Sequence, residues 1–548
     1  MSRNQNSRFA TNPTNLDISR SKFERSHTIK TSFNVGDIIP FYVDEVLPGD
    51  TFQIDTSKVV RLQTPITPFM DNIYLDTYYF FVPNRIVWEH WKQFQGENTE
   101  SAWLPTTEYT VPQIVAPDGG FAEGTIADYF GIPTKVAGLS VNALPFRAYA
   151  LICNDWFRDQ NLCDPLNIPL SDATVTGVNT GNFVTDVVKG GLPYKAAKYH
   201  DYFTSALPAP QKGADVGIGL AGSAAVLTDP TKVNNPTSKM TFNLISGSPV
   251  DSGGYAPAYF SDSASTKSSI YAGGSYADDV QLAPNNLFAD LGTASAVTIN
   301  ELRLAFQMQK LLEKDARGGT RYIEILKSHF GVTSPDARLQ RPEYLGGNRV
   351  PISVSQTIQT SQTTSDSPLG DTGAYSLTVD SHSDFTRSFT EHGFVIGLMV
   401  ARYDHTYQYG LERQWSRKTR FDYYFPVLAN IGEQAIKNKE IFAAGTSADD
   451  EVFGYQEAWA DYRYKPSRVT GEMRSNSAKT LDFWHVADKY SELPKLSAAW
   501  IFEDKSNVDR VLEVTSQVAN QLFADIFIRN YTTRPMPLYS IPGLVDHH

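Results

Sequence analysis

The alternation of apolar and polar residues predicts β-strands near both ends of the chain. In Thr51–Leu62, the apolar side chains of Phe52 and Ile54 alternate with polar ones, the pattern of a strand with one buried face. Leu522–Tyr531 alternates in the same way. Two such segments at opposite ends of the sequence predict a sheet assembled from distant parts of the chain.

Further apolar runs bounded by turn residues extend this β pattern. They are Ile38–Val46, Asn72–Val82, Val350–Gln359 and His392–Tyr403. The "LPGD" at Leu47–Asp50 has the Pro-Gly chemistry of a tight turn. Strand, turn and strand follow one another without a helical pattern between them, which favours antiparallel pairing. The expected fold class is mainly β, a Greek-key or jelly-roll sandwich with long insertions.

Three segments between the strands have helical patterns. Trp88–Phe94 places aromatic residues on one helical face, and Ala143–Phe157 is apolar with a proline near its start. Thr298–Gly331 predicts two helices, of which the first opens on a capping box and the second ends at Gly331. We expect these helices to lie in the insertions between strands.

One long segment differs in composition from the rest of the chain. Ala206–Asn286 is rich in glycine, alanine, serine and proline and contains no Arg, Glu, Trp, His or Cys. Such a segment buries little apolar area per residue and loses much backbone entropy on folding. We therefore expect a surface-exposed insertion and not part of the main core.

Composition excludes several classes of protein. The chain has 548 residues, a net charge of −12 and 12% aromatic residues, which is the balance of a core-forming protein and not of a free nucleic-acid binder. No signal peptide is recognisable at the start, and the longest uncharged apolar run, Phe394–Ala401, is too short to span a bilayer. Cys153 and Cys163 could pair, but two reduced, partly buried thiols are the expected state.

The N-terminal segment is basic although the chain as a whole is acidic. Its cations are Arg3, Arg8, Arg20, Lys22, Arg25 and Lys30, against only Asp17 and Glu24. A solvated, frayed terminus gives such a pattern. An arm laid against phosphate or against an acidic neighbouring subunit gives it equally well.

A search for catalytic and cofactor motifs finds none in a suitable context. Gly217–Gly222 ("GIGLAG") fits G-x-G-x-x-G, but it follows no apolar strand and Pro230 interrupts what should be its helix. His382, Asp384, His392, Asp404 and His405 are close in sequence, yet their irregular spacing is that of surface or interface residues and not of a metal site. The acidic runs Asp278-Asp279 and Asp449–Glu451 are the kind that glycosidases need, but solvated loop charges are the expected interpretation.

Several long motifs resemble one known family. They include "VDEVLPGDTF" (Val43–Phe52), "YFFVPNR" (Tyr79–Arg85) and "PEYLGG" (Pro342–Gly347), within longer matching segments. Those segments are Phe23–Ile54, Pro68–Glu97, Arg341–Thr357, Arg413–Ile436 and Ile528–Gly543. They resemble the major capsid proteins of gokushoviruses, small single-stranded-DNA phages of the microvirus family. The resemblance is weakest across Ala206–Asn286.

The resemblance implies a structural protein and not an enzyme, with no cofactor. It implies an eight-stranded antiparallel jelly roll, about 60 copies of which close an icosahedral T=1 shell around a circular single-stranded DNA genome. It also implies a small basic DNA-packaging protein and an internal scaffolding protein as partners, assembly in the host cytoplasm, a place in the virion and no membrane insertion. The expected divisions are a basic arm at 1–32, first strands and insertions at 33–205, a threefold protrusion at 206–286, the remaining strands with the helical insertion at 287–531, and an extended arm at 532–548.

Two groups of side chains are the candidate contacts of such a shell. The genome-facing candidates are Arg3, Arg8, Arg20, Lys22, Arg25 and Lys30, followed by the weaker set Arg413, Arg417, Lys418 and Arg420, for which intersubunit ion pairs are an equal alternative. The candidates for facing a host cell-surface receptor are the aromatic residues of the insertion, Phe242, Tyr255, Tyr259, Phe260, Tyr271 and Tyr276. The alternative function is a β-sandwich carbohydrate-binding protein or glycosidase.

Overall fold

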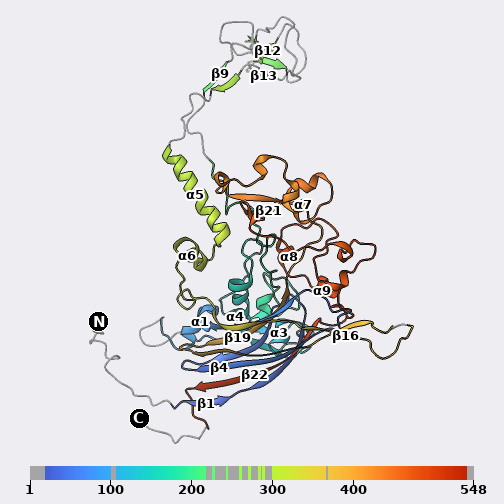
Figure 1. The fold of residues 1–548 in the computed structure, drawn as a ribbon. Helices are drawn as coiled ribbons and strands as arrows, with labels where there is room; N and C mark the ends of the chain where they lie inside the picture. Colours follow the sequence, from blue (N-terminus) through green and yellow to red (C-terminus); the bar gives the residue numbers. More distant parts are fainter. Residues whose placement is uncertain are drawn as a thin grey trace. The chain divides into compact units, whose positions relative to one another are not determined.

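The computed structural model describes residues 19–99, 107–217, 299–365 and 368–539, together with the backbone of six short strands between 217 and 299. The chain forms two compact units. One contains Met1–Lys212 and Glu313–His548, and the other contains Gly213–Leu312. Figure 1 shows the ribbon coloured along the sequence.

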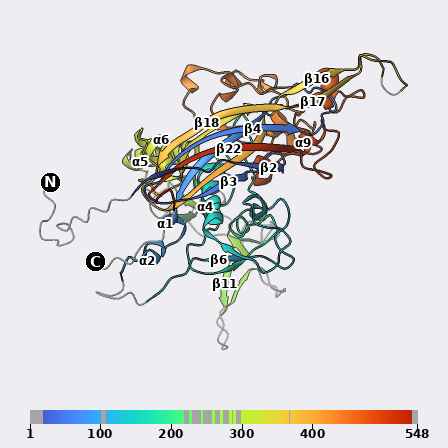
Figure 2. The ribbon, with the colours of Figure 1, turned by 90° about the horizontal axis from the view of Figure 1, so that it is seen from below.

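The larger unit contains two antiparallel sheets. The first sheet joins β1 (Ser21–Glu24), β2 (His27–Phe33), β22 (Leu522–Arg534), β4 (Thr51–Leu62) and β18 (Thr378–Ser388). The strands β1 and β2 pair with successive parts of the same edge of β22, so they occupy one position in the sheet. Figure 2 shows β18, β4, β22 and β2 side by side in that order.

The second sheet faces the first. It joins β15 (Glu343–Pro351), β5 (Ile73–Pro83), β19 (Gly393–Tyr403) and β3 (Ile39–Val46), in that order. Along the chain, β2, β4, β18 and β22 fall in the first sheet, and β3, β5, β15 and β19 fall in the second. The prediction of a mainly β, antiparallel fold is confirmed, and this strand order is consistent with a jelly roll.

Burial explains why the strands of the two sheets have different sequence patterns. Strands β4 and β22 alternate buried and exposed residues because only their inner face meets the core between the sheets. Strand β19 is buried along almost its whole length, because a second core covers the outer face of its sheet. That second core is built by the insertion between β5 and β15, with α4 (Leu144–Ile152) at its centre. A strand covered on both faces needs a continuous apolar run.

The remaining elements are short and lie mostly in the insertions. In the larger unit they are α1 (Asn84–Val87), α2 (Trp91–Phe94), β6 (Gln113–Val115), α3 (Ile126–Tyr129), β7 (Ser140–Asn142), β8 (Val175–Thr176), α6 (Tyr322–Phe330), β16 (Val354–Ile358), β17 (Thr372–Ser376), β20 (Glu433–Lys437), α7 (Asn438–Ile441), β21 (Val452–Glu457), α8 (Ala498–Ile501) and α9 (Ser506–Asp509). The smaller unit holds β9 (Ala225–Thr228), β10 (Phe242–Leu244), β11 (Ala258–Ser261), β12 (Ser269–Ala272), β13 (Leu282–Pro284) and β14 (Leu287–Asp290). Helix α5 (Ile299–Gly318) begins in the smaller unit and ends in the larger one.

Two of the expected elements differ in the structure. The predicted strand Val350–Gln359 is divided between β15 and β16, because Ile352 and Ser353 turn the chain out of the second sheet. The predicted helix Trp88–Phe94 forms only its second half, as α2, while Trp88 is buried beside it with an extended backbone. The predicted basic arm at 1–32 contains β1 and β2, both of which pair with β22.

Close backbone contacts explain the two glycines of the "PEYLGG" motif, Gly346 and Gly347. A Cβ on Gly346 would meet the backbone oxygen of Asp384 in β18, and a Cβ on Gly347 would meet that of Thr77 in β5. Strand β15 is also irregular at this point, between Tyr344 and Gly346. Only glycine allows the backbone of β15 to approach β18 of the first sheet and β5 of its own sheet this closely.

A buried ionic network connects several loops of the larger unit. His405, just after β19, lies between two carboxylates, 2.8 Å from Asp488 and 2.9 Å from Glu503. The ammonium of Lys198 lies 3.3 Å from Asp488, and all four side chains are at most 3% exposed. The hydroxyl of Tyr490 donates to Asp488 as well, at 2.7 Å. Three distant parts of the chain are thus joined without exposure to water.

The network gives stability a defined pH dependence. Burial by itself lowers the pKa of His405, but Asp488 and Glu503 outweigh that effect and raise it from 6.5 to about 10. Burial raises the pKa of Asp488, but His405 and Lys198 outweigh it and lower the pKa below 3.8. The contribution of His405 is therefore complete below pH 6.5 and is lost as the pH rises toward 10, whereas that of Asp488 is complete above pH 3.8 and is lost in acid.

We predict that His405→Gln lowers the free energy of unfolding of the unassembled subunit by about 3 kcal/mol at pH 6, because it leaves buried carboxylates without their partner. Urea unfolding from pH 4 to 10 measures this, and the difference from the wild type should shrink toward pH 10. The matched control is His90→Gln, because His90 makes a half-exposed pair with Asp172 and its loss should cost less than about 1 kcal/mol. Equal losses in the two variants would contradict the assignment.

Candidate functional site

The outward face of the first sheet is a broad open surface. In Figure 1, β1, β22 and β4 form the lower layer, while β19 and helices α1 and α4 lie on the other side. The alternation in β22 turns Phe523, Asp525, Phe527 and Arg529 away from the core, and all four are exposed. The second sheet has its outer face covered by a core, so the two sheets differ in what they can offer a partner.

Strand register sets the neighbours of the two outward rings. Phe523 lies between Ser32 of β2 and Arg61 of β4. Phe527 lies between Thr28 and Ser57 in the same way. The two phenylalanines are 39% and 40% exposed, a large fraction for side chains in the middle of a sheet. Rings that can stack on bases, with hydroxyl and guanidinium groups beside them, are the chemistry of single-strand nucleic-acid binding.

Two cations of this surface were not among the predicted residues. Arg61 and Arg529 are both exposed on the outward face, and within the described ranges neither makes an ion pair. Each stands in a strand whose sequence pattern emphasises its buried side. Only the pairing of β4 with β22, segments more than 450 residues apart, brings them to one surface, so the signal is absent from local sequence.

The predicted N-terminal cations lie along the edge of the same sheet. Arg20 donates to the carbonyl of Gly49 at 3.0 Å, and the ammonium of Lys22 lies 4.3 Å from the ring centre of Tyr531. Arg25 makes a two-pronged ion pair with Asp44.

Lys30 projects from β2 onto the outward face, where it pairs with Asp525 at 2.9 Å. Both side chains are more than half exposed, so solvent screens this pair and leaves the ammonium accessible. Arg3 and Arg8 lie outside the described residues.

Of the second predicted basic cluster, Arg413, Arg417, Lys418 and Arg420, two cations are paired with carboxylates and two are exposed to solvent. Arg413 pairs with Glu440 at 2.9 Å, and Arg417 pairs with Asp461. Their side chains are only 19% and 9% exposed. Lys418 and Arg420 are exposed. Half of this cluster is therefore committed to carboxylates of its own chain.

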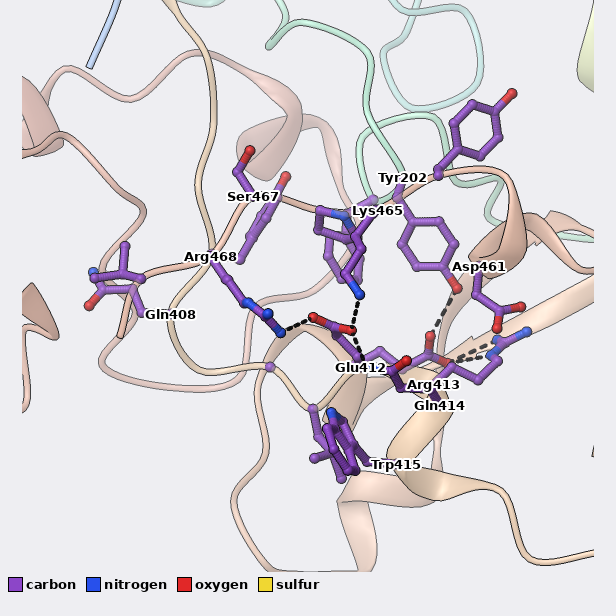
Figure 3. A pocket seen from close by; sticks show the side chains of 18 of the residues that line it. Tyr202, Gln408, Glu412, Arg413, Gln414, Trp415, Asp461, Lys465, Ser467 and Arg468 are labelled. Carbon is purple, nitrogen blue, oxygen red and sulfur yellow. Dashed lines mark hydrogen bonds and ion pairs between the residues drawn. The ribbon is translucent and has the colours of Figure 1, made fainter. Parts of the chain in front are cut away.

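A cavity of about 320 Å³ opens beside this cluster (Figure 3). Glu412 stands at its centre and accepts ion pairs from Lys465 at 3.1 Å and Arg468 at 2.7 Å. Burial by itself lowers the pKa of Arg413 on the cavity wall, but Glu440 outweighs that effect and raises it. The side chains on this wall thus neutralise one another in pairs.

The residues considered for catalysis and metal binding are scattered. His405 is buried in the ionic network, so its expected surface position is wrong, because two carboxylates compensate its charge there. Asp384 accepts a hydrogen bond from Thr56, and the ring of His392 packs against Trp91. In the part of the chain that the structure describes, no three His, Cys, Asp or Glu side chains could together hold a metal ion. Of Gly217–Gly222, only Gly217 is described.

The acidic runs are occupied by local partners. Asp449 accepts backbone hydrogen bonds from Ala444 and Gly445, which makes it a turn residue. Asp450 binds Lys437 and Lys439, whose ammonium groups lower its pKa to about 2. A general acid needs a raised pKa, so this carboxylate is unsuited to protonate a leaving group. Asp278 and Asp279 lie outside the described residues.

The two cysteines are free thiols, as expected, and both are buried. Burial raises the pKa of Cys163 to about 11 and that of Cys153 further. Such thiols are poor nucleophiles at neutral pH. Among the described helices, none has the length and apolar character to cross a bilayer.

The predicted receptor-facing residues are only partly described. Phe242 lies in β10, Tyr259 and Phe260 in β11, and Tyr271 in β12. Tyr259 is the pairing partner of Tyr271 in the β11–β12 ladder. Tyr255 and Tyr276 lie outside the described residues.

Comparison with known proteins finds similarity along nearly the whole chain. A family model described as "Capsid protein (F protein)" matches residues 11–544. Capsid protein VP1 of Spiroplasma virus 4 is 46% identical over 534 residues, with 96% of each chain covered. Capsid protein VP1 of Bdellovibrio phage phiMH2K is 44% identical over 545 residues, covering 99% of this chain and 98% of the relative. Capsid protein VP1 of Chlamydia phage 1 is 41% identical over 589 residues, covering 98% and 97%.

Proposed function

Because this chain belongs to the capsid protein (F protein) family, among the capsid proteins of gokushoviruses, we propose that about 60 copies of it close a T=1 icosahedral shell around a circular single-stranded DNA genome. Family membership makes the chain a structural component of a virion and not an enzyme. The single observation that carries the shell proposal is the antiparallel sandwich, covered on one outer face and open on the other.

The difference between the two outer faces suggests which one meets the genome. The insertions cover the second sheet with an apolar core, and they are the variable, exterior kind of structure. The first sheet presents a polar face with Phe523 and Phe527 among hydroxyl groups and cations. We therefore assign the outward face of the first sheet to the inside of the shell.

Contact with DNA there would depend on stacking and on few charges. Lys22, Arg61 and Arg529 supply cations, while Lys30 shares its charge with Asp525. Bases can stack on the two rings without sequence preference, as an encapsidated genome requires. The predicted N-terminal residues contribute to the edge of this surface, and the cluster around Arg413 is the weaker candidate because two of its four cations are held by carboxylates.

The smaller unit is the proposed site of host attachment. It is a separate compact unit, Gly213–Leu312, and its predicted insertion is poor in the residues that build a main core. Aromatic side chains on short strands are suited to binding a cell-surface receptor. A small basic packaging protein, an internal scaffolding protein and assembly in the host cytoplasm belong to the same proposal.

A carbohydrate-binding or glycosidase function has less support. Of its candidate acids, Asp449 is bound by backbone N–H groups, Asp450 is bound by two lysines, and Asp278 and Asp279 lie outside the described residues. The family is one of structural proteins.

The first prediction concerns assembly itself. The purified chain, expressed alone or with its phage partners, should form closed shells roughly 25–30 nm across in negative-stain electron microscopy. Sedimentation should show one particle of about 60 copies. A monomer with sugar-cleaving activity would instead support the alternative function.

The second prediction concerns the genome surface. Arg61→Ala combined with Arg529→Ala should weaken binding of a fluorescent oligothymidylate and reduce the slope of log K against log salt by about 1.4, because about 0.7 is lost for each phosphate contact on a single strand. Fluorescence anisotropy at several salt concentrations measures both values. Lys418→Ala combined with Arg420→Ala is the matched control and should leave the slope unchanged. If the control carries the loss, the DNA lies against the second cluster.

The third prediction concerns the insertion. Strands β9 and β14 pair antiparallel, with Thr228 opposite Leu287, so residues 229–286 can be replaced by an Asn-Gly turn. The shortened chain should still form shells, since the deleted part lies within the smaller unit. Phage carrying it should adsorb to host cells at least about tenfold more slowly, the effect of losing about 1.4 kcal/mol of contact. Loss of shells would show that the segment is an interface between subunits.

A further inference from the structure

Seven aromatic side chains form an exposed surface around the loop that follows β19. This aromatic surface consists of Trp415, Phe421, Tyr423, Tyr424, Phe425, Tyr462 and Tyr464, which are between 43% and 69% exposed. Trp415 lies at one edge of the cavity in Figure 3, apart from the ion pairs. Scattered exposed apolar residues need no explanation, but a group of this size does.

Contacts between the rings and with Arg417 connect these side chains into a surface. The ring of Tyr424 lies 6.2 Å from that of Tyr462 and 5.7 Å from that of Trp459 beneath it. The guanidinium of Arg417 lies over Tyr462 at 4.3 Å and over Tyr423 at 5.5 Å. Trp415, Tyr462 and Tyr464 meet at the rim of one cavity. Phe421 lines a neighbouring cavity together with Arg417 and Trp459, and Phe425 directly follows Tyr424 in the sequence. These aromatic side chains therefore gather around Arg417 and Trp459.

The backbone beneath the patch is held in an unusual conformation. Trp459 has a φ of +64°, a left-handed value that a bulky residue rarely adopts. Its indole N–H donates to the carbonyl of Leu428 at 2.8 Å, and its backbone N–H donates to Gln434 at 3.0 Å. Trp459 is 5% exposed and supports Tyr424 and Tyr462 from below. Strain of this kind is retained where the surrounding structure fixes a functional arrangement.

The size of the patch matches a protein interface. At 43% to 69% exposure, each ring presents about 100 Å², so seven rings present roughly 700 Å². The largest apolar patch of an ordinary monomer is about 300–600 Å², whereas a standard interface buries about 800 Å² on each partner.

The charges around the patch argue against nucleic acid as its binding partner. Four cations around the rings are paired with carboxylates: Asp461 holds Arg417, Glu457 holds Arg463, and Glu412 holds both Lys465 and Arg468. Lys418 and Arg420 are exposed, and Arg420 lies over the ring of Phe421 at 5.3 Å. Phosphate affinity needs cations that are free to replace counterions. Tyr, Trp, Phe and Arg, with most of the neighbouring cations paired to carboxylates, are instead the composition of interface cores between proteins.

We propose that the aromatic surface binds a second copy of this chain. The inference rests on the proposed function, because a closed shell obliges every subunit to bury such surfaces on its neighbours. The rings are the anchors of the contact, Arg417 and Trp459 hold them in place, and the paired charges form its rim. The loop between the β19 strand and β20 is therefore a determinant of assembly.

The test compares two double variants of the full chain. Trp415→Ser with Phe421→Ser removes the two most exposed rings of the patch. Tyr322→Ser with Phe330→Ser removes two rings that are 64% and 73% exposed but stand at opposite ends of α6, where they form no continuous surface. Thermal unfolding of the unassembled subunits should be unchanged in both, because surface substitutions are nearly neutral.

Analytical ultracentrifugation and electron microscopy give the readout. We expect the patch variant to need at least about tenfold more subunit to associate, since aromatic anchors dominate interface energies, and the control to associate like the wild type. Patch-variant shells at the wild-type yield would overturn the proposal, and shells of normal yield that lack DNA would assign the surface to the genome instead. A wild type that associates into small oligomers without closing shells would overturn the shell proposal alone. A wild type that stays monomeric at every concentration would overturn both.

Discussion

The burial of the second sheet on both of its faces is the constraint on which the rest of the structure depends. Strand β19 is apolar and buried from Gly393 to Ala401, so water must be excluded from either side of it. The first sheet supplies one cover, through the core that Phe52, Ile54 and Ile526 share with it. The insertion around α4 supplies the other. The insertion is therefore part of the fold, and it leaves the first sheet as the one with a free outer face.

Charged side chains of the larger unit are mostly paired within the chain. The chain carries 48 Lys and Arg residues and 60 Asp and Glu residues. Around the cavity beside Arg413, most of the described cations pair with a carboxylate of the same chain. His405, Lys198, Asp488 and Glu503 repeat this inside the core, where an unmatched charge would be far more costly. A cation that is paired within the chain is less available to bind an external anion. Unpaired cations such as Arg61 and Arg529 are therefore the better candidates for that role.

Local sequence predicted the strands much better than the surfaces they build. The alternation in β4 gave its bounds, Thr51–Leu62, because a half-buried strand needs that period. It could not predict that Phe523 lies opposite Arg61, since the register with β22 depends on a segment more than 450 residues away. For Arg413 and Arg417 the sequence left genome contact and intersubunit ion pairs open, because the carboxylates that they bind, Glu440 and Asp461, stand 27 and 44 residues further along the chain. Long-range pairing, which pattern does not encode, decided each of these cases.

The two open surfaces of the larger unit differ in a way that the roles we propose for them would explain. On the first sheet, the rings are separated by Ser, Thr and unpaired cations, so each ring stands alone in a polar setting that favours a hydrated, charged polymer. Around Trp459, the rings of Tyr424 and Tyr462 contact each other and most of the neighbouring cations are paired with carboxylates, which is typical of an interface between proteins. A shell subunit must hold a nucleic acid loosely and its neighbours firmly. In the roles proposed here, the outward face of the first sheet and the aromatic surface divide these two tasks, because their side chains and charges are arranged differently.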